Sequence, residues 1–483
     1  MHIVDLVIFI VYMLVVLGVG FYFLRKNNNM DDYYVGGRKM GSMHVGLSVV
    51  ATDVGGGFSI GLGGLGFIMG ISGSWMLFTG LVGAWLSAVF LIPKVSVMNE
   101  KYRFLTFPQI FEVLFTRRVA VLAAIVSAVG YLGFTSSQLL AGAKLASATF
   151  PELDLQSALI IMGIIAVVYT VIGGLKAVIY TDTFQWILLM TGLIGIGIPV
   201  GYVSVGGYSA IVETLPKEFL KLSNISWQTI INWGVTIIPI WFVGMTLYQR
   251  IYATKDKKSA QRAWYFAGFL EWPLMAFMGV ILGLFARVAF ENGMFAELGY
   301  AAGSDIDPEM GLPLFLRTVL PIGLMGLMLS AFFSAVLSTA DSCLMAASGN
   351  IFTDILDKIY KMPADPGSIL RISQMLTLVI GGLALFIAVS MENVLELMLY
   401  SYAFMVSGLF VPVIAGFYWK NATAKGAFAA MLGGGLTTLL LIISQANLPL
   451  GLDANVYGLT ISAILMVVVS ITDKKYNVLP KVG

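Results

Sequence analysis

The chain has 483 residues, of which 58% are hydrophobic and only 11% are charged, and its mean hydropathy is +0.90. Soluble domains are usually about 25% charged, so the composition excludes an ordinary soluble protein and predicts an all-helical, polytopic membrane protein. The net charge of +2 says nothing about nucleic acid, but no basic cluster lies in a soluble segment, so we expect no nucleic-acid partner. Two histidines with one cysteine exclude a His/Cys metal site and an intrachain disulfide.

The apolar stretches predict thirteen membrane-spanning helices. The first lacks a preceding basic region and is too long for a signal peptide, so we expect it to be retained. The spans are expected near residues 3–24, 41–71, 75–99, 118–148, 155–174, 178–204, 228–250, 263–287, 316–350, 370–390, 394–418, 426–444 and 456–472.

Basic residues predict the orientation, because cytoplasmic loops are enriched in Lys and Arg. One set of loops and span ends, which includes Arg250, holds 23 of the 28 basic residues. The other set holds only Lys144, Lys217, Lys221, Arg287 and Arg317. We therefore expect a plasma-membrane protein with its N-terminus outside and its C-terminus in the cytoplasm.

The second predicted span is interrupted by a charge and three glycines. Asp53 lies in the middle of an apolar stretch, and Gly55, Gly56 and Gly57 follow it. A charge at membrane depth costs roughly 2.5–3.5 kcal/mol, and each glycine weakens a helix by about 1 kcal/mol. The pattern favours a helix that unwinds near the midplane, where freed carbonyls can bind a cation. The alternative is a glycine-rich packing face with one paired acid.

The seventh predicted span is also interrupted, by Pro239 and Gly244. It follows the second span by five helices, and broken helices in corresponding positions are typical of transporters built from inverted repeats. The alternative is a proline kink that serves packing alone.

The ninth predicted span carries a polar stripe. Ser338 and Thr339 follow Ala335 by three and four residues, so they share one helical face, and Asp341 and Ser342 continue it. Hydroxyl and carbonyl oxygens form the kind of cage that suits a hard cation. A stripe that only packs against neighbouring helices is the alternative.

Further acids and aromatic residues lie near these spans. Asp182 is placed near a cytoplasmic end, where acids are often merely solvated, and Glu271 is embedded and either pairs locally or lines the transport route. Aromatic rings near the breaks can stack on a substrate, although such residues more often belong to the core or the interface belt. They include Phe58, Trp75, Trp241 and Tyr248.

Four motifs in order resemble the sodium/solute symporter family over roughly residues 3–470. They are ATDVGGGFSIG, YTVIGGLKAVIYTDTFQ, MTLYQRIYA and SAVLSTADSCLMAASGNIFTDI. The chain is similar to the high-affinity choline transporter and proline symporter branches of that family.

The resemblance implies a leucine-transporter-like core of two inverted five-helix repeats with broken helices at the midplane. The extra helix would be 3–24, the repeats about 41–204 and 228–418, and the peripheral C-terminal helices about 426–472. The family's sodium site maps onto Ala51, Val54, Ala335, Ser338 and Thr339, which matches the cage expected from spacing. A second sodium site, present in some members, would map onto Asp182, Ser338, Asp341 and Ser342, and Asp341 stands where several relatives have Ser.

Asp53 distinguishes the two branches. Choline transporters place a Trp of their aromatic cage at this position, whereas proline symporters resemble this chain in having Asp. The acid could pair with a substrate ammonium or organise the sodium site, and the sequence leaves both roles open.

We therefore predict a sodium-coupled symporter, not an enzyme, that takes up a small polar solute, most simply an amino acid or another ammonium-bearing compound. Its partners would be sodium, the solute and membrane lipid. The alternatives are a proton-coupled transporter of the same fold, an intramembrane aspartyl protease that uses Asp182 and Asp341, and a channel or sensor. The candidate solute-binding residues are Asp53, Gly56, Phe58, Trp75, Trp241 and Tyr248.

Overall fold

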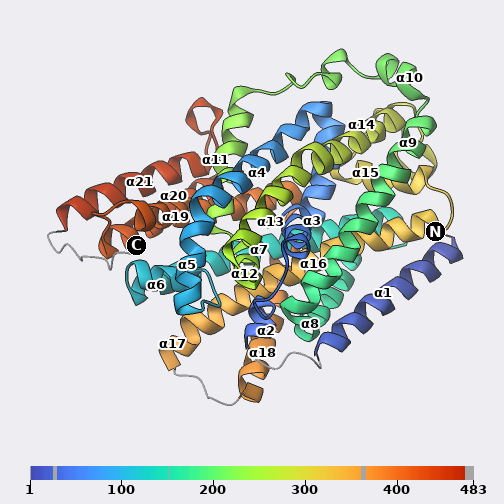
Figure 1. Cartoon of the computed structure of the whole chain (residues 1–483). Coiled ribbons are helices and arrows are strands. Elements are labelled where there is room, and N and C mark those ends of the chain that lie inside the picture. The colour runs from blue at the N-terminus through green and yellow to red at the C-terminus, as the bar shows by residue number, and fades with distance from the viewer. Residues whose placement is uncertain (1, 25–29, 151, 361–365, 474–483) are drawn as a thin grey trace.

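The computed structural model describes residues 2–24, 30–150, 152–360 and 366–473. Within these ranges the side chains of some helical residues, among them Val54, Phe58 and 172–177, lie outside the description. No β-strand occurs in the described part of the chain, which folds entirely into helices (Figure 1).

The first part of the chain forms helices α1 (Ile3–Leu24), α2 (Met30–Val35), α3 (Ser42–Met69), α4 (Trp75–Leu86), α5 (Ile92–Tyr102), α6 (Pro108–Leu114), α7 (Arg117–Thr149), α8 (Leu155–Gly192), α9 (Ile198–Ser204) and α10 (Gly207–Thr214). The second part forms α11 (Trp227–Val243), α12 (Met245–Ala253), α13 (Lys257–Leu270), α14 (Phe277–Glu291), α15 (Pro308–Val319), α16 (Leu324–Gly349), α17 (Asp357–Tyr360), α18 (Pro366–Val389), α19 (Val394–Tyr418), α20 (Ala424–Ser444) and α21 (Ala454–Thr472). Single π-helical turns interrupt four of the long helices, at η2 (Ser87–Leu91), η3 (Leu193–Gly197), η5 (Glu271–Ala276) and η7 (Asn350–Leu356).

The predicted spans coincide with apolar helices. Among the described residues, nine helical stretches are long and apolar enough to cross a membrane, and the bent pair α11 and α12 makes a tenth. One of the nine, Gly55–Tyr102, contains the end of the second predicted span and the whole of the third. The shorter apolar stretches Ile3–Val16 and Leu155–Val171 correspond to the first and fifth. The chain is therefore a multi-pass membrane protein.

One boundary differs from the prediction. The spans expected at 155–174 and 178–204 both begin in the single helix α8. No proline occurs between Pro151 and Pro199, so the sequence has no residue that must end the helix there. Asp154 caps the start of α8 by accepting a hydrogen bond from the backbone N–H of Ser157 at 2.9 Å.

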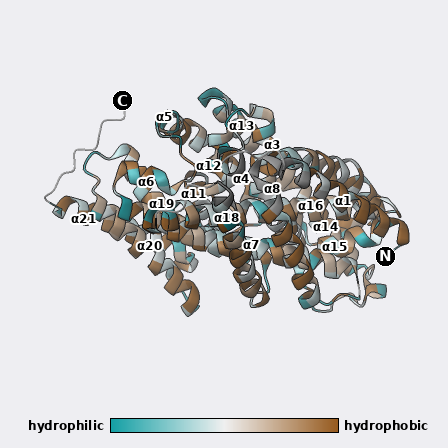
Figure 2. Cartoon of the chain, turned by 90° about the horizontal axis from the view of Figure 1, so that it is seen from below, coloured by the Kyte–Doolittle hydropathy of each residue, from teal (hydrophilic) through white to brown (hydrophobic). Residues whose placement is uncertain are grey.

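Helix α16 lies at the centre of the molecule. All its residues from Ser330 to Gly349 are buried, and it packs on α1, α3, α7, α8 and α18. Helix α1 flanks the core on one side, while α20 and α21 pack on each other and on α19 at the opposite side (Figure 1). Hydrophobic residues dominate these outer helices, as expected for surfaces that face lipid (Figure 2).

Candidate sodium and solute sites

The first helix break lies in α3 at Gly55. Its backbone has φ 39° and ψ −164°, a conformation that residues other than glycine rarely adopt. The backbone groups around it find side-chain partners: Ser59 Oγ donates to the carbonyl of Gly55 at 2.7 Å, and the N–H of Gly57 donates to Gln138 Oε1 at 3.1 Å. The interruption expected at Asp53–Gly57 is thus confirmed.

The second break separates α11 from α12 at Gly244, where the chain bends by 42°. Gly244 has extended backbone angles, φ −69° and ψ 111°. The hydroxyl of Tyr131 in α7 accepts a hydrogen bond from the N–H of Thr246 at 3.1 Å, directly after the bend. The interruption expected in the seventh span is therefore also present.

Oxygen atoms from α3 and α16 converge beside the first break. Thr339 Oγ1 lies 3.2 Å from the carbonyl oxygen of Ala51 and 3.1 Å from that of Ala335. A cavity of about 10 Å³ touches Ala51, Gly55, Ala335 and Ser338, and a volume of this size holds roughly one water-sized particle. Four of the five predicted sodium ligands thus lie together; the side chain of the fifth, Val54, lies outside the described residues.

A buried arginine, which the sequence analysis placed at a cytoplasmic span end, lies next to these oxygens. Arg250 is 0% exposed and belongs to α12, which the bend at Gly244 directs into the protein. The charge count used for the orientation included it at the end of the seventh predicted span, whereas the protein encloses its side chain. The guanidinium donates to Ser48 Oγ (3.0 Å), the carbonyl of Thr246 (3.1 Å), Ser342 Oγ (3.0 Å), Asp182 Oδ2 (3.4 Å) and Thr52 Oγ1.

The same arginine connects the residues expected at a second sodium site. Asp182, which is 0% exposed, accepts hydrogen bonds from Ser338, from Ser48 at 2.5 Å and from Arg250, and Arg250 also reaches Ser342. Asp341 shares no hydrogen bond with this network. Its Oδ1 accepts a hydrogen bond from the hydroxyl of Thr170, and its Oδ2 accepts none. Full burial of Asp182 excludes the alternative of an acid that is merely solvated.

The aromatic candidates have partners of their own. The ring of Trp75 stacks with Trp272 at 6.2 Å, Trp241 packs edge-on against Trp264 at 6.3 Å, and the Tyr248 hydroxyl donates to the carbonyl of Phe242 at 2.7 Å. Gly56 allows α3 to pack closely on α16, because a Cβ at this position would overlap Val336. The side chain of Phe58 lies outside the described residues.

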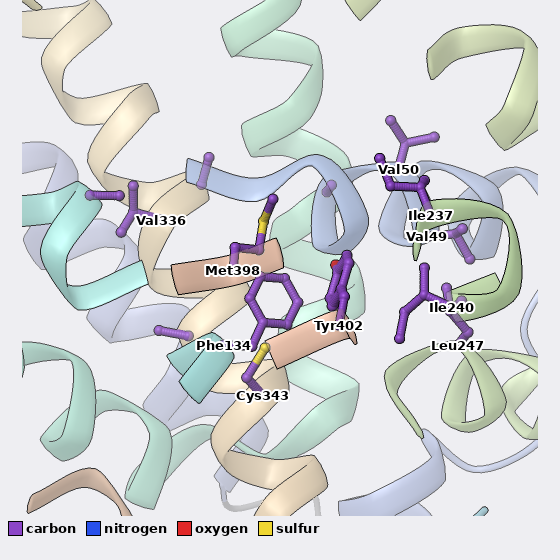
Figure 3. Packing of buried hydrophobic residues seen from close by; sticks show 14 of the residues in the cluster. Val49, Val50, Phe134, Ile237, Ile240, Leu247, Val336, Cys343, Met398 and Tyr402 are labelled. Atoms are coloured by element: carbon purple, nitrogen blue, oxygen red, sulfur yellow. The ribbon is translucent and has the colours of Figure 1, made fainter. Parts of the chain in front are cut away.

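Two buried acids, Asp53 and Glu271, lie next to each other near the first break. Asp53 is 6% exposed and Glu271 is 0% exposed; their carboxyl groups are neighbours, and Tyr402 of α19 lies beside Asp53. Figure 3 shows Tyr402 next to Phe134 of α7, with Met398 and Cys343 nearby. No pattern in the sequence links positions 53, 271 and 402, so neither the pairing of Glu271 with Asp53 nor the presence of Tyr402 beside them was predictable.

Comparison with known proteins shows which family the sequence matches. The model of the sodium:solute symporter family matches residues 33–434. The sodium/proline symporter of Salmonella typhimurium is 29% identical over 449 residues, covering 90% of this chain and 87% of that protein. The osmoregulated proline transporter OpuE of Bacillus subtilis is 26% identical, with 96% and 94% coverage, and the sodium/pantothenate symporter of Escherichia coli is 26% identical, with 95% and 94%.

Solved structures show the same fold. A Na+-coupled sialic acid symporter, solved in a substrate-bound outward-open state, superposes with a TM-score of 0.78 over 97% of this chain and 98% of that chain, at 22% identity. The inward-facing conformation of Mhp1 superposes with a TM-score of 0.50 at 13% identity, over 92% of this chain and 93% of that chain. The predicted leucine-transporter-like fold is thereby confirmed.

Proposed function

The chain belongs to the sodium:solute symporter family and takes up a small solute coupled to sodium, and from this premise we propose where the ion and the solute bind. Family membership leaves open the ligands of the sodium ion, the chemical class of the solute, the extents of the two repeats and the orientation in the membrane.

For sodium, we propose a site formed by the carbonyls of Ala51, Val54 and Ala335 with the hydroxyls of Ser338 and Thr339. The observation that carries it is Thr339 Oγ1, which contacts carbonyl oxygens of both α3 and α16 at the break. Sodium bound here would join the broken helix to α16. Because an ion can shift a conformational equilibrium only by its differential affinity, this junction would favour the state in which the solute site is formed.

A second sodium ion at Asp182, Asp341 and Ser342 remains a prediction. Such an ion would share Asp182 and Ser342 with the guanidinium of Arg250, which already neutralises part of the local negative charge. Asp341 would supply the free carboxylate oxygen.

For the solute, we propose an amino acid or another ammonium-bearing compound that binds beside the first break, with Asp53, Gly56, Phe58, Trp75, Trp241 and Tyr248 in or around its site. Asp53 supports the class, because a buried carboxylate next to freed backbone groups suits an ammonium. Two of the relatives named above are proline transporters by name, which agrees with this class.

We further propose that residues 41–204 and 228–418 form the two repeats, that the N-terminus is outside and that the C-terminus is cytoplasmic. The two breaks, at Gly55 and Gly244, fall near the start of each proposed repeat.

The test is uptake by the purified chain in proteoliposomes. Radiolabelled L-proline, L-lysine and putrescine are offered with an inward sodium gradient, with an equal potassium gradient, or with an inward proton gradient and no sodium. The account expects saturable uptake of at least one of them, driven by the sodium gradient. Uptake driven by the proton gradient alone, or uptake that does not saturate, would contradict it.

A further inference from the structure

Glu271 is a buried acid without a hydrogen-bond donor. It lies in the π-helical turn η5 between α13 and α14, is 0% exposed, and neither Oε1 nor Oε2 has a hydrogen-bond partner. Its carboxyl group rests on Gly80 of α4, where a Cβ would overlap Oε2. Isolated π-helical turns occur frequently at functional sites, and an ionisable residue at membrane depth needs a partner.

A second carboxyl group beside Glu271 makes the burial of its charge still less favourable. The carboxyl group of Asp53 lies next to that of Glu271, and Asp53 Oδ2 also has no hydrogen-bond donor. Three buried carboxyl oxygens, Oδ2 of Asp53 in α3 and both oxygens of Glu271 in η5, thus lie in neighbouring carboxyl groups and accept no hydrogen bond. Two carboxylates at this distance repel each other, and a positive group bound between them would relieve that repulsion.

No basic side chain of the described residues supplies that charge. Arg250 is buried close to the break, but its N–H groups are already engaged by Ser48, Thr52, Asp182, Ser342 and the carbonyl of Thr246. Lys144, the other fully buried cation that the structure describes, is paired with Asp307 at 2.5 Å and Glu309 at 2.6 Å.

The geometry points to Asp53 and Glu271 as a paired carboxylate anchor for a cationic nitrogen of the transported solute. The pair offers several acceptors and no donor, so it fits a primary ammonium or a guanidinium, each of which carries several N–H groups. The hydroxyl of Tyr402 lies beside Asp53 and adds a polar group that can also accept a hydrogen bond from the solute. This inference rests on the proposed function and narrows its solute class from ammonium-bearing compounds to those with a net positive charge.

The test measures solute binding to the full-length protein in detergent by thermal unfolding, since a ligand that binds the folded state raises the unfolding temperature. The probes are L-lysine, L-arginine, putrescine and L-proline, each in sodium and in potassium chloride. Wild type should be stabilised by a cationic probe in sodium. Glu271→Gln should weaken that binding about ten- to a hundred-fold, the loss expected for a charge-assisted contact, while the stabilisation by sodium alone stays unchanged. Glu291→Gln is the matched control, because Glu291 is partly exposed and pairs with Arg287.

A second comparison does not depend on the variant folding. L-norleucine has the side-chain carbons of L-lysine without the terminal ammonium, so it lacks the side-chain charge without added bulk and should bind wild type at least about ten-fold more weakly. Equal binding of the two, a response to L-proline alone, or a Glu271→Gln protein with wild-type affinity would each overturn the anchor while leaving sodium-coupled uptake intact. Solute binding that is equal in sodium and potassium would overturn the proposed function and the anchor together.

Discussion

At the scale of single residues, Arg250 and Asp182 place opposite charges in the protein interior, and each has several hydrogen-bond partners. Removing one partner of a buried ion pair typically costs about 3–5 kcal/mol, because the other charge stays buried and uncompensated. Asp182→Asn should therefore lower the unfolding temperature of the protein clearly, and it should also weaken sodium binding, because Ser338 donates to Asp182. Thermal unfolding in sodium and in potassium chloride measures both effects.

The control for this prediction is a double-mutant cycle. If the two residues act as a pair, Asp182→Asn combined with Arg250→Gln should destabilise the protein much less than the two single changes add up to. Additive effects would show that the two charges do not interact.

The sequence predicted some of these residues well and others not at all. Ala335, Ser338 and Thr339 lie on one regular helix, so their spacing alone placed them on one face, and the structure shows Thr339 touching the carbonyl of Ala335. Arg250 follows the break at Gly244, and the sequence does not determine in which direction the chain continues after that break. An arginine six residues beyond such a break can face either the cytoplasm or the core, and only the packing of α12 decides between them.

At the scale of elements, the break in α3 depends on Gly55. Its positive φ disfavours any side chain, and a Cβ there would overlap Thr339. Gly55→Ala should cost about 1–3 kcal/mol of stability and displace Thr339, so sodium affinity should fall with it. Sodium titrations followed by thermal unfolding provide the measurement.

Gly382→Ala is the matched control for Gly55→Ala. Gly382 lies in helix α18, and a Cβ there would meet no atom within 4 Å, so this change should preserve sodium binding and stabilise α18 slightly. If Gly55→Ala binds sodium as well as Gly382→Ala does, the break does not shape the ion site.

The sequence predicted the breaks within spans better than it predicted the ends of spans. Three consecutive glycines and Gly244 marked the breaks, because glycine changes the local backbone preference. Gly173 and Gly174 lie at the expected end of a span near residue 174, but the structure continues α8 through them, so glycine alone does not fix where a helix ends. Contacts such as Asp53 with Glu271 join elements far apart in the chain, so composition and periodicity could not predict them.

At the scale of the whole molecule, the charge distribution predicts which face is cytoplasmic. The single cysteine, Cys343, is buried, so a Cys343→Ser background allows labelling of introduced thiols without interference. In intact cells, Glu218→Cys should react with a membrane-impermeant maleimide, and Lys420→Cys should react only after permeabilisation. Both positions are exposed, so a difference reports the side of the membrane. The reverse pattern would invert the proposed orientation.

The central claim is that sodium binds where α3 breaks against α16, and sodium affinity of the substrate-free protein tests it most directly. Ser338→Ala and Thr339→Ala each remove one proposed ligand, whereas Ser330→Ala removes a buried hydroxyl of the same helix that only donates to the carbonyl of Gly326 at 2.6 Å. Thermal unfolding is titrated with sodium chloride at constant ionic strength. The account predicts at least about ten-fold weaker sodium binding for Ser338→Ala and for Thr339→Ala, with Ser330→Ala like wild type. Wild-type sodium affinity in both Ser338→Ala and Thr339→Ala would contradict it.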